Sequence, residues 1–235
     1  MELNNYWSDI DTRLNALCND GYTKLPSISN FNIEDTAENI YKEMNGNTFS
    51  ELCSSHKAFI DRLLINEQLV PKLFKIAKTK MGYKGSLTNQ YHVSRLVEPG
   101  NSKEMYRAHF DSHLFTIVFP IKIPIAKNSG NSGELIYFPN SRKPPKNEIH
   151  NFIGKAFHKK YASKEGLKNF EKNNNMLVDN FIDYKPLLFI GNTTLHTNKP
   201  VAKDCSSYRL TLLAHFFDPS PKFGVGNILR TIRKR

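Results

Sequence analysis

The chain has 235 residues, of which 39% are hydrophobic and 16 are phenylalanine, so it is long and apolar enough to form one well-packed core. Its three cysteines, Cys18, Cys53 and Cys205, are odd in number and far apart, which excludes a disulfide framework and favours a reduced, cytoplasmic compartment. The formal net charge of +11 favours anionic partners, although solubility alone explains such a charge equally well.

Targeting and membrane segments are not expected. Residues 1–5 contain no basic segment followed by an apolar one, so the pattern of a signal peptide is missing. The longest apolar stretch, 114–126, is interrupted by prolines and a lysine and is too short to cross a bilayer. The basic run 230–235 is interpreted as a solvated end.

The first third of the chain is predicted to be helical. Apolar residues recur at helical spacing from Trp7 to Leu17, and this helix is expected to stop at Asp20-Gly21. A short strand over 22–25 follows. The same spacing predicts three further helices, over 32–44, 50–65 and 68–81.

The remainder is predicted to be mainly strands, over 88–98, 106–113, 115–124, 134–138, 186–193 and 208–217. Helices followed by strands indicate an α+β chain in which a helical layer packs on a β-sandwich or barrel. No repeat or linker divides the chain, so a single domain over 1–235 is expected. Within it, 1–85 form the mainly helical support, 86–218 the β core and 219–235 a basic tail.

Residues 143–175 interrupt the strand pattern. Apolar residues recur at helical spacing as far as Tyr161, with lysines and histidines between them, which predicts a helical insert between strands. Such an insert either forms a lid over the substrate or covers the outside of the barrel, and both interpretations stay open.

Three side chains form a candidate metal site. His109 and Asp111 are two positions apart on a predicted strand, so their side chains point the same way, and His196 would be the third ligand. Two histidines and one carboxylate leave coordination positions open and are typical of non-haem Fe(II) oxygenases. Arg209 supplies the fixed cation that a dicarboxylic co-substrate needs. The alternative is a core histidine with a surface salt bridge.

This combination resembles the Fe(II)/2-oxoglutarate-dependent dioxygenase superfamily and, within it, the phytanoyl-CoA dioxygenase-like branch. In that pattern an arginine follows the distal histidine by about ten to fifteen residues, and Arg209 lies 13 positions after His196. The resemblance runs from about residue 15 to 218. It is also carried by Asn19–Pro26 (NDGYTKLP), Ser132–Arg142 (SGELIYFPNSR), His196-Thr197-Asn198 and Arg209-Leu210-Thr211.

The resemblance implies a double-stranded β-helix, a jelly-roll barrel of the cupin-like kind. It implies iron, Fe(II), bound by His109, Asp111 and His196, and 2-oxoglutarate bound by Arg209 with help from the Thr211 hydroxyl. O2 would be the second co-substrate. Three hydroxyl-bearing residues are candidates for a further 2-oxoglutarate contact, with packing as the alternative for each: Tyr91, Tyr106 and Thr116.

The expected activity is hydroxylation of an anionic or carrier-linked small molecule, with release of succinate and CO2. Related halogenases have a small residue in place of the metal-binding aspartate, so Asp111 favours hydroxylation. The alternatives are an oxygenase that modifies a protein or nucleic acid, for which no appended reader domain is present, and a non-catalytic jelly-roll binding protein. The substrate and the oligomeric state stay open.

Other charged residues have two interpretations each. His113 and His215 are expected to be structural histidines, although His113 is close enough to Asp111 to face the same cavity. Arg95, Lys122 and Arg142 would bind an anionic substrate or lie at the surface as solvated charges.

Overall fold

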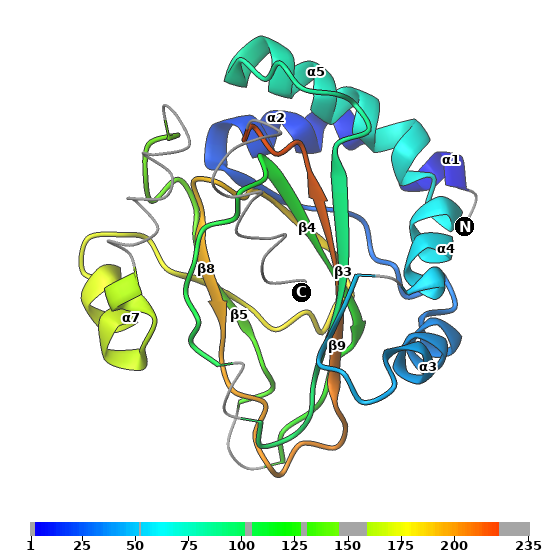
Figure 1. The fold of residues 1–235 in the computed structure, drawn as a ribbon, viewed down its shortest axis with the longest axis vertical. Helices are drawn as coiled ribbons and strands as arrows, with labels where there is room; N and C mark the ends of the chain where they lie inside the picture. The colour runs from blue at the N-terminus through cyan, green and yellow to red at the C-terminus, as the bar shows by residue number, and fades with distance from the viewer. Residues whose placement is uncertain (1–2, 52, 102–104, 128–130, 146–158, 221–235) are drawn as a thin grey trace.

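The computed structural model describes residues 3–51, 53–101, 105–127, 131–145 and 159–220. Two antiparallel sheets face each other, and helices lie on the outer sides of both sheets (Figure 1). None of the described helices is long and apolar enough to span a bilayer.

The N-terminal part is mainly helical, as predicted. It contains α1 (Leu3–Tyr6), α2 (Ile10–Asp20), β1 (Tyr22–Lys24), α3 (Ile33–Met44), β2 (Phe49–Ser50), α4 (Ser54–Arg62), the π-helical turn η1 (Ile65–Leu69) and α5 (Val70–Met81). Helix α2 ends at Gly21, whose φ of 84° suits glycine. The helix predicted over 50–65 is shorter, because Leu64 adopts a left-handed φ of 53° and the chain continues into η1.

The C-terminal part supplies most strands. It contains β3 (Gln90–Val97), β4 (Phe115–Lys122), β5 (Leu135–Phe138), the 3-10 helix η3 (Lys159–Tyr161), α7 (Lys164–Glu171), β6 (Leu177–Asp179), β7 (Leu187–Ile190), β8 (Leu195–Asn198) and β9 (Arg209–Phe216). The larger sheet has the order β1-β7-β4-β9-β3-β2, and the smaller one has the order β6-β5-β8. Every strand pair within these sheets is antiparallel.

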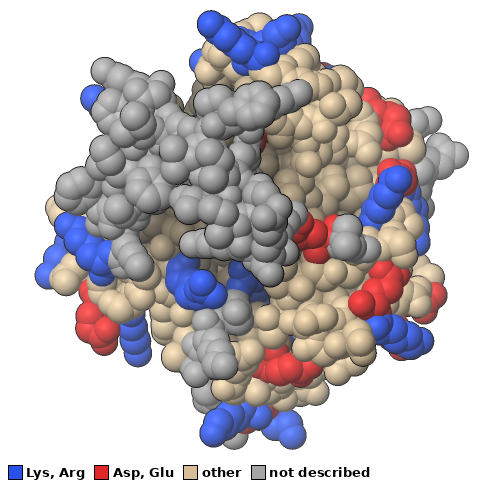
Figure 2. Space-filling view, in the orientation of Figure 1, with Lys and Arg blue, Asp and Glu red and all other residues tan. Residues whose placement is uncertain are grey.

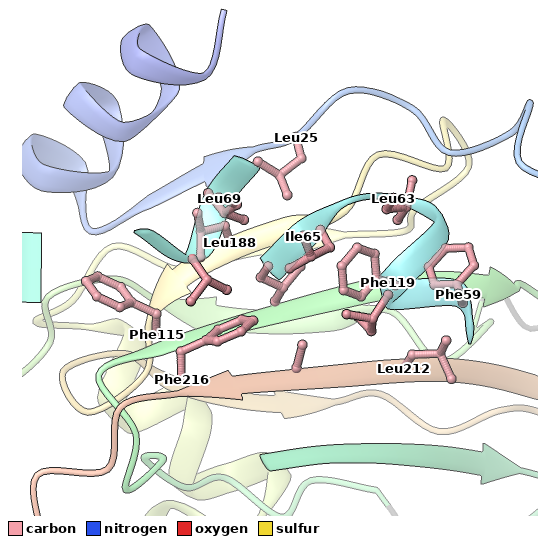
Figure 3. Packing of buried hydrophobic residues seen from close by; sticks show 14 of the residues in the cluster. Leu25, Phe59, Leu63, Ile65, Leu69, Phe115, Phe119, Leu188, Leu212 and Phe216 are labelled. Carbon is pink, nitrogen blue, oxygen red and sulfur yellow. The ribbon is translucent and has the colours of Figure 1, made fainter. Parts of the chain in front are cut away.

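The outer face of the larger sheet packs against the N-terminal helices. On β4 the alternating residues Phe115, Ile117 and Phe119 point to this side and are fully buried. Phe119 makes an edge-to-face contact with Phe59 of α4, with ring centroids 5.6 Å apart. Figure 3 shows the rings of Phe59 and Phe119 next to each other and near Leu63. The other labelled residues belong to the same core.

The inner faces of the two sheets meet in a second cluster. Val118 and Phe189 of the larger sheet pack with Leu135 and Tyr137 of the smaller sheet. Each sheet therefore packs against helices with one face and against the other sheet with its second face. Any cavity between the sheets is lined by side chains of the second face.

The described part of the predicted insert covers the outer face of the smaller sheet. Leu167 and Phe170 of α7 pack with Phe138 and Leu195, and the rings of Phe138 and Phe170 are 5.0 Å apart. This arrangement agrees with the covering helix, one of the two interpretations. Residues 146–158 of the insert and 221–235 of the basic tail lie outside the described residues.

The strand predicted over 106–113 is wrong. In this segment a single β-bridge forms, between His109 and His196. The neighbouring amides use other partners: Asp111 N donates to Gly191 O and Leu114 N to Phe217 O. The backbone amides from His109 to Leu114 therefore donate hydrogen bonds to three different parts of the chain. The alternation of side chains in the sequence does not distinguish this arrangement from one continuous strand. Strands β2, β6 and β8, which are two, three and four residues long, were not predicted.

Two histidines lie between α4 and β3, of which His56 is buried and His92 is half-buried. His56 is 3% exposed, and its Nδ1 lies 3.4 Å from Ser94 Oγ, whereas its Nε2 has no hydrogen-bond partner among the described residues. The ring of His92 lies 5.6 Å from it. Burial, reinforced by neighbouring histidines, lowers the pKa of His56 to about 3 and that of His92 to about 4.

We expect the free energy of unfolding to fall as the pH drops from about 6.5 towards 4, because both imidazoles take up protons only when the chain unfolds. Each contributes a slope of up to about 1.4 kcal/mol per pH unit in this window. Urea unfolding of His56→Gln at pH 7 and pH 5 should show a smaller loss than the parent protein. Ser94→Ala is the control, since it keeps the titrating ring; equal losses in the parent and His56→Gln would contradict the prediction.

Candidate active site

The β-bridge between His109 and His196 holds the two imidazoles side by side. Each backbone N–H of the pair donates to the other residue's carbonyl, at 3.1 Å in both directions. The ring centroids are 4.4 Å apart. Since β8 carries His196 on its cavity side, the bridge places the loop residue His109 there as well.

Asp111 completes a group of three potential ligands. Its Oδ1 lies 3.6 Å from His109 Nε2 and 3.8 Å from His196 Nε2. The three ligand atoms lie within 4.8 Å of one another, and no other such group of His, Cys, Asp and Glu side chains occurs in the described part of the chain. Ligands that share one face of an octahedral divalent ion would be roughly 3 Å apart, so all three atoms would have to move inward to bind one ion.

Backbone carbonyls fix which nitrogen of each histidine faces the site. His109 Nδ1 lies 2.8 Å from Arg107 O, and His196 Nδ1 lies 3.2 Å from Thr194 O. Because a carbonyl oxygen only accepts, both Nδ1 atoms carry a proton, and the Nε2 atoms are the ring nitrogens that face Asp111. Desolvation by the surrounding protein lowers the pKa of His109 to about 4, even though half of its side chain is exposed, so it is neutral at pH 7.

Asp111 is buried and ionised. Burial alone would raise its pKa, but His196, His215 and His109 and the Thr116 hydroxyl outweigh burial and hold the pKa below its usual range. The site thus offers two imidazole nitrogens and one carboxylate oxygen, a donor set that suits Fe(II) and leaves coordination positions open.

Gly191, at the end of β7, permits the close approach of the loop that carries Asp111. Its carbonyl accepts from Asp111 N at 3.1 Å, and its N–H donates to Leu114 O at 2.9 Å. A Cβ at this position would lie 2.8 Å from Thr116 Oγ1, 2.9 Å from His113 O and 3.0 Å from Asp111 Cβ. Only glycine therefore fits at position 191 without moving these neighbours.

A cavity of about 160 Å³ lies beside the three ligands, between the sheets. Arg209 and Thr211 line it from β9, and Arg209 is 3% exposed. Desolvation, reinforced by the nearby Arg95, lowers the pKa of Arg209 to about 10, so the guanidinium stays charged at neutral pH. A buried arginine thus faces the same space as the ligand group.

The other predicted site residues are distributed unequally. Tyr91 and Thr116 line the cavity, where the Tyr91 hydroxyl donates to Glu51 and the Thr116 hydroxyl to Asp111. Tyr106 is not among the lining residues and packs against the cluster under α7.

Of the remaining charged candidates, some line the cavity and others do not. Arg95 and His215 line the cavity. Lys122 and Arg142 do not, since Lys122 Nζ lies 5.1 Å from the Tyr208 ring centre and Arg142 lies over Phe110 at 4.0 Å. Ring centroids place His113 5.1 Å from His215 in a stacked arrangement.

Asn198 is a cavity residue that the sequence analysis did not select. It lies two positions after His196 on β8, and therefore on the same strand face. Its Oδ1 is buried without a hydrogen-bond partner among the described residues. The i, i+2 spacing from His196 was the available signal. A buried amide atom without a partner is costly unless a ligand supplies one.

No protein-family model matches the chain, and no curated protein matches its sequence. Solved structures do match. They include the α-ketoglutarate-dependent epimerase SnoN from nogalamycin biosynthesis (11% identity, TM-score 0.57, covering 93% of this chain and 86% of that one). The fold is therefore similar to that of this α-ketoglutarate-dependent enzyme.

Two further structures have the same fold. The carbocyclase SnoK is 10% identical with a TM-score of 0.56, covering 93% of this chain and 89% of that one. A Pseudomonas putida prolyl-4-hydroxylase is 14% identical with a TM-score of 0.50, covering 88% and 92%. SnoN has also been solved with Fe3+, α-ketoglutarate and nogalamycin RO. The phytanoyl-CoA dioxygenase-like branch is not tested by these structures.

Gly191→Ala should weaken metal binding by about tenfold or more, because Asp111 or Thr116 must move to admit the new Cβ. Titration calorimetry with Co(II) measures this affinity. Gly85→Ala is the control, since its Cβ would also make a close contact, with the buried Tyr83 ring, but away from the cavity lining. A Co(II) affinity that is equal in both variants would show that Gly191 does not position the ligands.

Proposed function

We propose that this protein is an Fe(II)- and 2-oxoglutarate-dependent dioxygenase, whose two sheets form a double-stranded β-helix in a single domain. The observation that carries the proposal is the convergence of His109, Asp111 and His196 on one side of a cavity that also contains a buried arginine, Arg209. The bound metal would couple O2 reduction to conversion of 2-oxoglutarate into succinate and CO2 while a substrate is oxidised.

Arg209 is the residue we assign to the distal carboxylate of 2-oxoglutarate. Its guanidinium fork binds a carboxylate through two parallel hydrogen bonds, and burial strengthens this interaction. Thr211 and the Asn198 amide lie beside it in the cavity and offer further donors. Tyr91 and Thr116 already donate their hydroxyl protons to protein carboxylates, which makes them weaker candidates for this contact.

Arg95 supports an anionic substrate. It lies on β3 opposite Thr211 of β9, and it lines the cavity together with Arg209. Two guanidinium groups around one cavity make its potential more positive, which favours an acidic group on the substrate. We propose hydroxylation of a small molecule that carries such a group, and the presence of Asp111 favours this outcome over halogenation.

The surface charge gives less support to a nucleic-acid substrate. On the face shown in Figure 2, lysine and arginine side chains form separate groups, with aspartate and glutamate between them. A nucleic-acid-binding face usually carries a continuous basic stripe. Among the described residues on this face, the basic side chains therefore form no continuous stripe.

The direct test is succinate formation from 2-oxoglutarate by the purified protein with Fe(II) and O2. We expect slow turnover without substrate, and its loss in Asp111→Ala, which removes a ligand. Equal succinate formation in Asp111→Ala and the parent protein, or none in either under metal-loaded conditions, would refute the proposed function.

Arg209→Met should weaken 2-oxoglutarate binding by about 10- to 100-fold, since a charge-assisted hydrogen bond contributes roughly 1.5–3 kcal/mol. Co(II) binding should be unchanged, because the side chain is not a ligand. Calorimetry of the metal-free protein measures the Co(II) affinity, and calorimetry of the Co(II)-loaded protein measures the 2-oxoglutarate affinity. Arg142→Met is the matched control, as Arg142 is outside the cavity lining and donates to Asn192 O. Unchanged 2-oxoglutarate affinity in Arg209→Met would assign the carboxylate to another cation.

Arg95→Met should leave 2-oxoglutarate affinity within about threefold of the parent value but abolish the stimulation of succinate formation by acidic substrates, because the affected cation serves the substrate side. A panel of small carboxylates and phosphates, tested for such stimulation, measures this. A loss of 2-oxoglutarate affinity as large as that in Arg209→Met would mean that both arginines bind the co-substrate.

A further inference from the structure

The two carboxylate oxygens of Asp111 have different surroundings. Oδ1 faces the imidazoles of His109 and His196, at 3.6 and 3.8 Å. Oδ2 faces away from them: it lies 2.6 Å from Thr116 Oγ1 and 3.7 Å from His215 Nδ1. One oxygen is thus directed to the metal position and the other is bound by the protein.

The hydrogen bonds around Oδ2 have a defined direction. The ionised carboxylate only accepts, so the single Thr116 hydroxyl proton is donated to it. The Thr116 oxygen lies 3.0 Å from His215 Nδ1 and can then only accept, so this nitrogen carries a proton. The result is a chain of donors from His215 through Thr116 to Asp111, in which each bond polarises the next.

This chain is built on rigid elements. Thr116 and His215 are direct cross-strand neighbours on β4 and β9. The His215 ring is buried, and it stacks on Tyr91 at 5.8 Å and on His113 at 5.1 Å between ring centroids. Neither donor can therefore follow the carboxylate if it rotates.

We infer that Thr116, supported by His215, is a positioning residue that keeps Asp111 bound to the metal through Oδ1 alone. This inference rests on the proposed function. An octahedral ion has six positions, of which the three protein ligands and a chelating 2-oxo acid fill five. If Asp111 bound through both oxygens it would occupy the sixth, so the Thr116 hydroxyl preserves the position that O2 needs.

The test compares Thr116→Val, which keeps the shape and removes the hydroxyl, with Thr116→Ser, which keeps the hydroxyl. Nitric oxide serves as the probe of the open position, added without O2 to protein loaded with Fe(II) and 2-oxoglutarate. We expect Thr116→Val to bind nitric oxide about tenfold more weakly than the parent, and Thr116→Ser to bind it normally. Thr116→Ala is a second hydroxyl-free variant in case valine impairs folding, and it should behave as Thr116→Val.

Two other affinities separate the possible failures. Co(II) and 2-oxoglutarate affinities are measured for each variant by calorimetry, and thermal unfolding confirms that it is folded. If the parent protein binds no Co(II), the proposed function itself fails. If it binds both ligands, and nitric oxide affinity is equal in the parent, Thr116→Val and Thr116→Ala, only the positioning role is refuted. A loss of Co(II) affinity without a loss of nitric oxide affinity would also refute it, because Thr116 would then stabilise the ligand without guarding the open position.

Discussion

The two backbone hydrogen bonds between His109 and His196 are the constraint on which the site depends. They connect a loop that belongs to no sheet with a four-residue strand of the smaller sheet. Without them nothing would hold the two imidazoles together, since strands β4, β5, β6 and β7 lie between the two residues in the sequence. Gly191 adds a second attachment on the side of the larger sheet. The loop that carries His109 and Asp111 is thus hydrogen-bonded to both sheets. Because the sheets are packed against each other, they hold this loop in place.

Much of the fold could be predicted from alternation in the sequence. Strands β4 and β9 have long apolar stretches, and helices α3 and α5 have clear apolar faces with Asn45 and Gly82 at their ends. Strand β8, with the sequence LHTN, has no such signal, because its inner side chains are a histidine and an asparagine that face a cavity. An alternating apolar pattern indicates a strand only where the inward side chains pack against apolar neighbours. The pattern is missing where the inward side chains line a polar cavity.

The ligand residues could be predicted from their chemical types and spacing, but their supports could not. The i, i+2 spacing of His109 and Asp111 suggested a shared strand face, whereas the two side chains actually converge through a loop. Thr116 was selected as a contact for the co-substrate, and its hydroxyl is directed to Asp111 because the chain turns between residues 111 and 115. Such a turn depends on tertiary hydrogen bonds from Gly191 and Phe217, and no local pattern encodes these.

The unequal exposure of the ligands has a kinetic consequence. About half of the His109 side chain is exposed, whereas those of His196 and Asp111 are about one-tenth exposed. Solvent therefore reaches the metal position past His109, and an ion entering the protein meets this imidazole before the two buried ligands. Exchange of a bound ion with a chelator in solution would follow the same route in reverse, so the access left open beside His109 would limit how quickly the protein is loaded or stripped.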